Sequence, residues 1–110
     1  MAKKKKKFIY VDCMWFYLSN IYSVGYGEMI TLGLLDALSK GKGYSTASNH
    51  YIATMLNIQE DTARKYLQKL RKLGLIDWIV DGKIRKIEVK KGEFYDELEK
   101  EYNEAVEKEK

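Results

Sequence analysis

Residues 57–76 read NIQEDTARKYLQKLRKLGLI. The apolar residues of this stretch recur at helical spacing, and they are Ile58, Ala63, Leu67, Leu70 and Leu73. The other positions are mostly charged or polar, and Gly74 ends the pattern as glycine commonly ends a helix. The stretch therefore predicts an amphipathic helix over about residues 60–73. Its charged side faces either water or an acidic partner.

The residues before this helix predict a second, shorter helix and a tight turn. Ser48 is a good N-cap for a helix over residues 49–56. Asn57 stands at the turn, and Asn tolerates the left-handed backbone conformation. Ala53 and Ala63 lie ten positions apart and supply small residues where the two helices cross. Together these features predict a helix-turn-helix.

The segments on either side of this motif extend the pattern. Apolar spacing predicts a helix over residues 28–41, with Gly41 as its C-cap. Residues 75–89 hold two β-rich runs around Asp81-Gly82, a pair suited to a type I′ turn that places Asp77 opposite Lys86. The order helix, short helix, turn, helix, hairpin is the layout of a winged helix-turn-helix.

Two further elements are expected at the ends of the chain. Residues 8–11 favour a short strand, and residues 13–22, apolar nearly all round, favour a buried helix, although a strand also fits. Residues 93–108 predict a last helix with an apolar stripe, formed by Phe94, Leu98, Tyr102, Ala105 and Val106. The stripe is expected to pack against the body or a second subunit and to make a homodimer.

The sequence thus predicts an α+β winged helix-turn-helix: a three-helix core with a two-stranded β-wing, an N-terminal strand or helix and a C-terminal helix. We expect a disordered basic arm (1–7), a DNA-binding domain (8–92) and an acidic helix (93–110). Residues 1–92 carry 17 Lys and Arg and 8 Asp and Glu, a net charge of +9. Residues 93–110 carry 3 Lys and 8 Asp and Glu, a net charge of −5. A basic body suggests a polyanionic partner, with solubility alone as the alternative.

Several classes of protein are disfavoured. The 110 residues contain one Cys and one His, so no intramolecular disulfide forms and a zinc site of those ligands is not expected. A reducing, cytoplasmic location fits, and Cys13, in an apolar run, is expected to be buried and inert. No run approaches the roughly 20 apolar residues of a membrane span. The sequence shows no phosphate-binding Gly loop and no nucleophile–base pair, so neither an enzyme nor a cofactor is predicted.

Three groups of side chains are expected to bind duplex DNA. The helix over residues 60–73 and its start contribute Gln59, Thr62, Arg64, Lys65, Gln68 and Lys69. The hairpin contributes Lys83, Arg85 and Lys86, and the start of the short helix contributes Ser48, Asn49 and His50. Arg, Lys, Gln and Thr are the types that bond base edges and phosphates. The alternatives are a solvated helix, and a solvated hairpin on which Trp78 stacks against Arg85.

Two charged segments have more than one interpretation. Glu60 and Asp61 begin the recognition helix, where the helix dipole favours carboxylates, so capping is preferred over acceptance from cytosine N4. The lysines of residues 3–7 either follow the DNA backbone or only solubilise the chain.

Residues 26–76 resemble the winged-helix domain of replication initiators and replisome organisers from phages and plasmids of Gram-positive bacteria. GKGYSTASNHYIA (41–53) and LRKLGLI (70–76) carry the resemblance, whereas Gln59 departs from the Ser that is frequent there. The resemblance implies a duplex-DNA-binding protein. Because the chain stops soon after the hairpin, we expect an accessory that marks a replication, transfer or partition site and meets a replication, relaxosome or partition protein. A transcriptional repressor and a protein-interaction scaffold are the other hypotheses.

Overall fold

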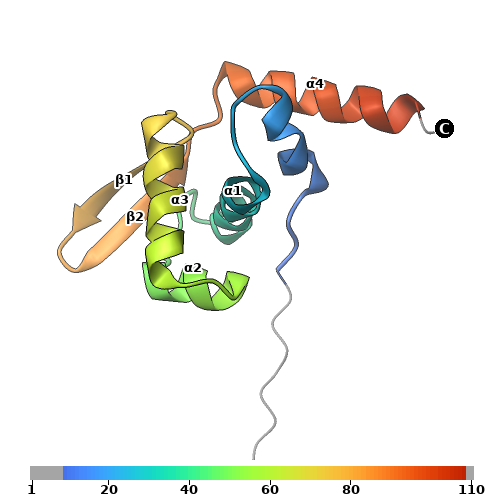
Figure 1. Cartoon of the computed structure of the whole chain (residues 1–110). Coiled ribbons are helices and arrows are strands. Elements are labelled where there is room, and N and C mark those ends of the chain that lie inside the picture. The colour runs from blue at the N-terminus through green and yellow to red at the C-terminus, as the bar shows by residue number, and fades with distance from the viewer. Residues whose placement is uncertain (1–8, 109–110) are drawn as a thin grey trace, which may run out of the picture.

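A computed structural model describes residues 9–108 and has the predicted order of elements (Figure 1). The helical elements are η1 (Cys13–Asn20, a 3₁₀ helix), α1 (Tyr26–Leu38), α2 (Asn49–Leu56), α3 (Glu60–Lys72) and α4 (Glu93–Lys108). The strands β1 (Ile76–Asp81) and β2 (Ile84–Val89) pair antiparallel as a two-stranded wing. The wing projects from one side of the helices, and α4 extends away from it (Figure 1). No helix in the described range is long and apolar enough to span a membrane.

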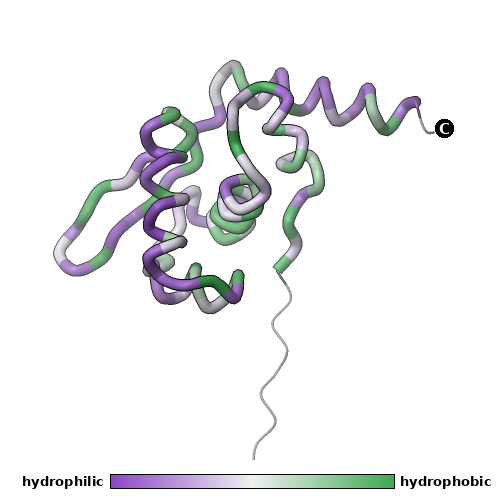
Figure 2. Tube along the Cα trace, viewed as in Figure 1, coloured by the Kyte–Doolittle hydropathy of each residue, from purple (hydrophilic) through white to green (hydrophobic). Residues whose placement is uncertain are grey.

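The core lies where α1 meets η1 and α3. Leu32 and Leu35 of α1 are fully buried, together with Trp15 of η1 and Leu70 of α3. Ile87 brings the base of the wing into the same cluster. Figure 2 shows the green, hydrophobic residues of α1 at the centre of the helices and the purple, hydrophilic ones along α3. Burial of this shared apolar surface therefore fixes α3 and the wing on one scaffold.

The predicted helix-turn-helix is confirmed in its details. The Ser48 hydroxyl accepts the Tyr51 N–H at 3.0 Å and caps α2. Asn57 ends α2 with φ 54°, the left-handed conformation expected of it. Ala53 and Ala63 are buried where α2 crosses α3. The small side chains let the two helices approach, and the turn then directs α3 outward.

Tyr66 closes the junction between α3 and the start of α1. A Cβ at Gly27 would overlap the ring of Tyr66, so only glycine leaves room for that ring. The Glu28 side chain accepts the Gly25 N–H at 3.1 Å and steadies the first turn of α1. The predicted helix over 28–41 therefore begins earlier, at Tyr26, and it ends earlier, with Ser39 as its C-cap in place of Gly41.

The register of the hairpin differs from the prediction by two residues. Asp81 pairs with Ile84, so the turn residues are Gly82 and Lys83, not Asp81 and Gly82. Gly82 has φ 64°, as a type II′ turn requires of its first central residue. Asp77 faces Glu88, and the predicted cross-strand pair of Asp77 with Lys86 is wrong. A shift of two residues preserves which side chains share a face, because strand side chains alternate with period two.

The loop between α1 and α2 joins the wing through one isolated antiparallel β-bridge. Ser45 and Ile87 exchange two backbone hydrogen bonds of 2.8 Å each. The buried Ser45 hydroxyl also accepts the Ala47 N–H at 3.2 Å. The GYSTASN segment thus attaches the wing to the start of α2, and Ser45 and Ser48 have structural roles there.

The C-terminal helix packs on the 3₁₀ helix. Leu98 is fully buried, and the rings of Tyr17 and Tyr102 meet edge to face with centroids 5.6 Å apart. The predicted packing of the stripe against the body is confirmed, although Val106 stays 41% exposed. Two expectations nearby are wrong: residues 9–11 form no strand, and Cys13 is exposed. Residues 1–7, the expected basic arm, and residue 8 lie outside the described residues.

Candidate nucleic-acid interface

The outer face of α3 is polar and strongly charged. Its inner face holds Ala63, Leu67 and Leu70, and the opposite face is formed by Asp61, Lys65, Gln68 and Lys72, all of which are exposed. Arg64 lies on the edge nearer the wing with its side chain 49% exposed, and the Lys65 side chain is 68% exposed. The side chains of Arg64, Lys65 and Gln68 are therefore exposed on a helix whose opposite face is buried in the core.

One carboxylate at the start of α3, that of Asp61, pairs with cations of the same helix. Asp61 accepts a hydrogen bond from Arg64 and lies 3.3 Å from Lys65 Nζ. The hydrogen bond from Arg64, with that from Lys65, lowers the pKa of Asp61. Gln59, not Glu60 or Asp61, is the N-cap, and its side chain makes no cap hydrogen bond. Both carboxylates lie in the first turn, as predicted, where the helix dipole favours negative charge.

Lys69 points to α1. Its Nζ lies 2.9 Å from Glu28 Oε1, and Glu28 is buried. Burial alone would raise the pKa of Glu28, but the hydrogen bonds from Lys69 and from the Gly25 N–H outweigh it, and the pKa is lowered. Lys69 keeps 46% of its side chain exposed. Lys69 therefore links α3 to α1, and the exposed part of its side chain lies beside the charged outer face of α3.

A stack of one indole and two guanidinium groups connects the wing to its surroundings. Arg71 of α3 lies over the Trp78 ring at 4.0 Å, and Arg85 approaches the same ring at 5.3 Å. Arg71 also donates to Asp77 at 2.9 Å, and the pKa of Asp77 is lowered by the Trp78 N–H and then by Arg71. The predicted stacking of Trp78 on Arg85 is present, but Arg71 is the nearer partner.

Arg85 also reaches the loop before α2. It donates to the Ala47 carbonyl at 3.0 Å, and burial lowers the pKa of its guanidinium. Lys86 is also engaged: its Nζ lies 3.3 Å from Asp81 and 5.3 Å from the Tyr44 ring. Lys83 is therefore the exposed cation of the wing turn. Arg85 and Lys86, by contrast, also make contacts that stabilise the wing and the loop beside it.

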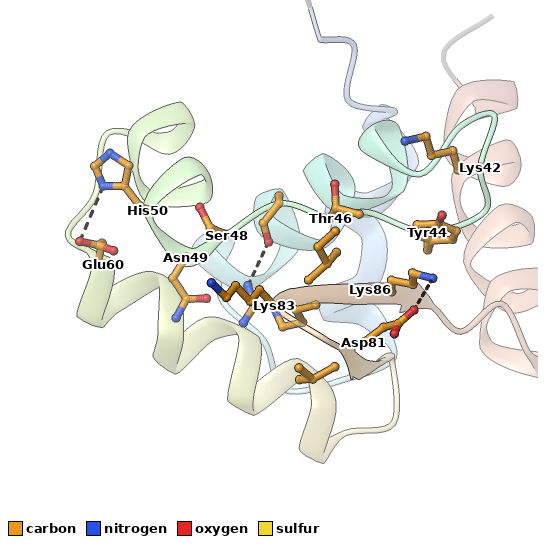
Figure 3. A pocket seen from close by; sticks show the side chains of 14 residues that line it. Lys42, Tyr44, Thr46, Ser48, Asn49, His50, Glu60, Asp81, Lys83 and Lys86 are labelled. Carbon is orange, nitrogen blue, oxygen red and sulfur yellow. Dashed lines mark hydrogen bonds and ion pairs between the residues drawn. The ribbon is translucent and has the colours of Figure 1, made fainter.

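A groove of about 900 Å³ separates the wing from the start of α2 (Figure 3). The loop from Lys42 to Ala47 forms its floor on one side, and the first turn of α2 continues it. Ser48, Asn49 and His50 line it there, as Lys83, Arg85 and Lys86 do from the wing. His50 reaches Glu60 of α3 at 3.7 Å across one end. The groove brings a helix N-terminus and several cations together, an arrangement suited to an anion.

The predicted site residues thus fall into two neighbouring areas. The α3 area holds Gln59, Thr62, Arg64, Lys65, Gln68 and Lys69, and the groove holds the six from the wing and α2. Sequence reasoning missed Lys72 on α3 and Lys42 in the groove. Helical spacing from Lys65 and Gln68 could have found Lys72, whereas only the fold brings Lys42 to the wing. Within residues 9–108, no cluster of His, Cys, Asp and Glu could hold a metal ion.

Three helices followed by an antiparallel hairpin define the winged helix-turn-helix class. No protein-family model matches the chain, and no curated protein matches its sequence.

Two solved structures are similar to it in fold: a point mutant of S. aureus MepR bound to an oligodeoxyribonucleotide, with a TM-score of 0.62, and an S. aureus MepR–DNA complex, with a TM-score of 0.58. Each is 18% identical and covers 86% of this chain. The chain spans 66% and 65% of those MepR chains. At such identity the likeness shows the fold, and it confirms the predicted α+β winged helix.

Proposed function

We propose that this chain binds duplex DNA, with the outer face of α3 in the major groove and the wing beside it, and that it represses transcription by occupying its site. The observation that carries the proposal is the meeting of three cationic elements on one scaffold. Arg64, Lys65 and Lys72 stand on α3, Lys83 stands on the wing turn, and Lys42 lies across the groove from it. α4, the acidic helix, extends away from the wing (Figure 1).

Each element has a separate task in this proposal. Arg, Lys and Gln on α3 have the donors that base edges in the major groove accept. The groove suits a phosphate of the adjacent backbone, because the first N–H groups of a helix point out of its N-terminus and the helix dipole favours negative charge there. Ser48, Asn49 and His50 are the residues we assign to that phosphate. Lys83 then reaches the next phosphates along the strand.

The choice of repression rests on the comparisons. Both similar structures are of MepR with DNA, and MepR is a transcriptional repressor. The second candidate is the marking of a replication, transfer or partition site, which rests on the GKGYSTASNHYIA resemblance in the sequence. Both roles need the same duplex reader. Sequencing the genomic fragments that the chain retains separates them, because repression requires sites that overlap promoters and the second role requires sites at an origin.

We further infer a homodimer, since two-fold dimers of this motif bind paired half-sites. Val106, 41% exposed beyond the packed part of the stripe, is the residue of α4 that we expect a second copy to cover. Light scattering should give twice the chain mass for the free protein, and that mass plus the mass of one duplex for the complex with DNA. A monomer mass at high micromolar concentration, with and without DNA, contradicts the dimer.

The test of DNA binding is a fluorescence titration of a labelled duplex selected by the chain from a random pool. Lys65→Ala and Lys72→Ala should each weaken binding by about tenfold, within the roughly 1–3 kcal/mol of a specific contact. Lys100→Ala, an exposed lysine of α4, is the matched control and should leave the affinity unchanged. If the chain retains no duplex at any salt concentration, DNA binding is wrong and the scaffold hypothesis takes its place.

A further inference from the structure

The strand β1 has one side without a neighbouring strand. The sheet has the order β1-β2, and the bridge between Ser45 and Ile87 lies on the far side of β2. The outer side of β1 is therefore a free edge, and such an edge presents backbone N–H and C=O groups that can pair with another chain. Two β-branched side chains add to this risk, because Ile79 is 65% exposed and Val80 is 67% exposed.

The bridge to Ser45 determines which residues of β1 face the free edge. Ile87 gives both its N–H and its C=O to Ser45, at 2.8 Å each, so neither group bonds to β1. Ile87 and its partner Trp78 are therefore a non-hydrogen-bonded pair, and such pairs alternate with hydrogen-bonded pairs along an antiparallel ladder. It follows that the N–H and C=O groups of Trp78, and those of Val80 two residues on, point away from β2 to the free edge.

Two side chains occupy this edge at Trp78. Asp77 Oδ1 accepts the Trp78 N–H at 2.9 Å, and Arg71 Nη2 donates to the Trp78 C=O at 3.4 Å. Arg71 Nε donates to the same Asp77 oxygen at 2.9 Å, which joins the two side chains. Asp77 and Arg71 thus give Trp78 the acceptor and the donor that a residue of a paired strand would give it. Within residues 9–108, no side chain bonds to the backbone of Val80 in this way.

We propose that the free edge of β1 is a strand-pairing surface for a second copy of this chain, and that Arg71 and Asp77 keep it closed by taking the place of the neighbouring strand. The proposal concerns association between copies and does not depend on DNA binding. Because Arg71 belongs to α3, the edge is closed only while the wing lies against that helix. Movement of the wing away from α3 therefore opens the edge.

A second copy fits this surface because the edge is complementary to itself. Two β1 strands that pair antiparallel with Trp78 opposite Val80 join residues that all face the free edge. The same register sets Ile79 of each copy opposite the other, a favourable contact between β-branched side chains. It also sets Asp77 against Asp81 of the other copy, and like charges directly opposite each other are unfavourable. The charge of Asp77 therefore opposes pairing in addition to its hydrogen bonds.

The test measures the mass of the chain after the edge is opened. The opened variant is Arg71→Ala with Asp77→Ala, and both side chains are exposed, so the core is untouched. The matched control is Glu88→Ala with Lys90→Ala, which removes another exposed ion pair beside the same hairpin. In light scattering at high micromolar concentration, the opened variant should have at least twice the wild-type mass, and the control should have the wild-type mass. Adding Val80→Pro to the opened variant should restore the wild-type mass, because proline lacks the N–H that faces the edge while the ladder to β2 loses no bond.

Hydrogen exchange of the wild type is a second test that needs no variant. The N–H groups of Trp78 and Val80 both face the free edge, but only that of Trp78 has an acceptor there. After correction for intrinsic rates, the Trp78 N–H should exchange roughly tenfold more slowly, the order set by one hydrogen bond to a charged group. If circular dichroism shows that the opened variant is unfolded, Arg71→Ala replaces it in the mass measurement. Equal exchange rates, a wild-type mass for the folded variant, or an increased mass that Val80→Pro leaves unchanged would each overturn the proposal.

Discussion

Arg85 is the residue whose replacement best separates the cations that stabilise the wing from those that we propose bind DNA. Arg85→Met keeps most of the aliphatic stem and removes the donor to the Ala47 carbonyl, together with the approach to the Trp78 ring. A hydrogen bond from a charged donor contributes about 1.5–3 kcal/mol, and an exposed cation–π contact about 0.5–1 kcal/mol. Because the guanidinium is only partly buried, we take the lower part of the range. We expect a loss of about 2 kcal/mol in the free energy of unfolding.

Thermal unfolding followed by circular dichroism measures this loss. In a domain of this size, about 2 kcal/mol corresponds to roughly 10 °C in Tm. Lys83→Met, at the exposed turn of the same hairpin, is the control and should leave Tm nearly unchanged. In a salt titration of DNA binding, the two variants should rank the other way, with Lys83→Met showing the larger effect. Loss of one phosphate contact lowers the slope of log K against log salt by about 0.9. Equal Tm values for the two variants would refute the structural role of Arg85.

Three further variants probe the helices. Asp61→Asn removes the negative charge that pairs with Arg64. Because that charge also repels phosphates, the variant should bind all duplexes more tightly and to the same extent. A titration in which the affinity for one sequence alone increases would argue against this. Glu28→Gln tests pH dependence: a folded pKa below the usual 4.5 contributes stability that is present above that value and is lost as pH falls through the folded pKa. In urea denaturation, the free energy of unfolding of the wild type should therefore exceed that of the variant at neutral pH. The difference should shrink as pH falls below 4.5, and a constant difference would contradict the pairing. Gly27→Ala should cost about 1–3 kcal/mol by overpacking Tyr66, and a Gly27→Ala Tyr66→Leu double variant should recover part of it.

The helix-turn-helix could be predicted because local chemistry specifies it. Ser48 is a preferred N-cap residue, and Asn57 tolerates a positive φ. Ala53 and Ala63 are the small residues where α2 crosses α3. The wing was predicted with the correct faces but the wrong register, since Gly82 fits the second place of one turn type and the first place of another. Local sequence contains both solutions, and only the packing of Ile87 against the core and Ser45 selects one.

Other features depend on contacts that a sequence pattern does not contain. Arg85 finds the Ala47 carbonyl 38 positions away, and Lys69 finds Glu28 41 positions away. Both residues therefore looked like free cations in the sequence. Cys13 was misplaced for a different reason. A 3₁₀ helix has three residues per turn, so Trp15 and Leu18 align on the buried side while Cys13 and Ser19 align on the exposed one.

The pairing of η1 with α4 has a consequence for how the chain folds. Tyr17 and Tyr102, in contact in the native state, are separated by 85 positions along the chain. Contacts of such sequence separation raise the contact order and slow folding, because the loop entropy is lost before the contact forms. α1 covers one part of the apolar surface of η1, and the part that faces α4 remains uncovered until α4 arrives. We therefore expect α4 to dock last and, in hydrogen exchange, to open before α1 and α3, which leaves the helix-turn-helix intact while the C-terminal helix detaches.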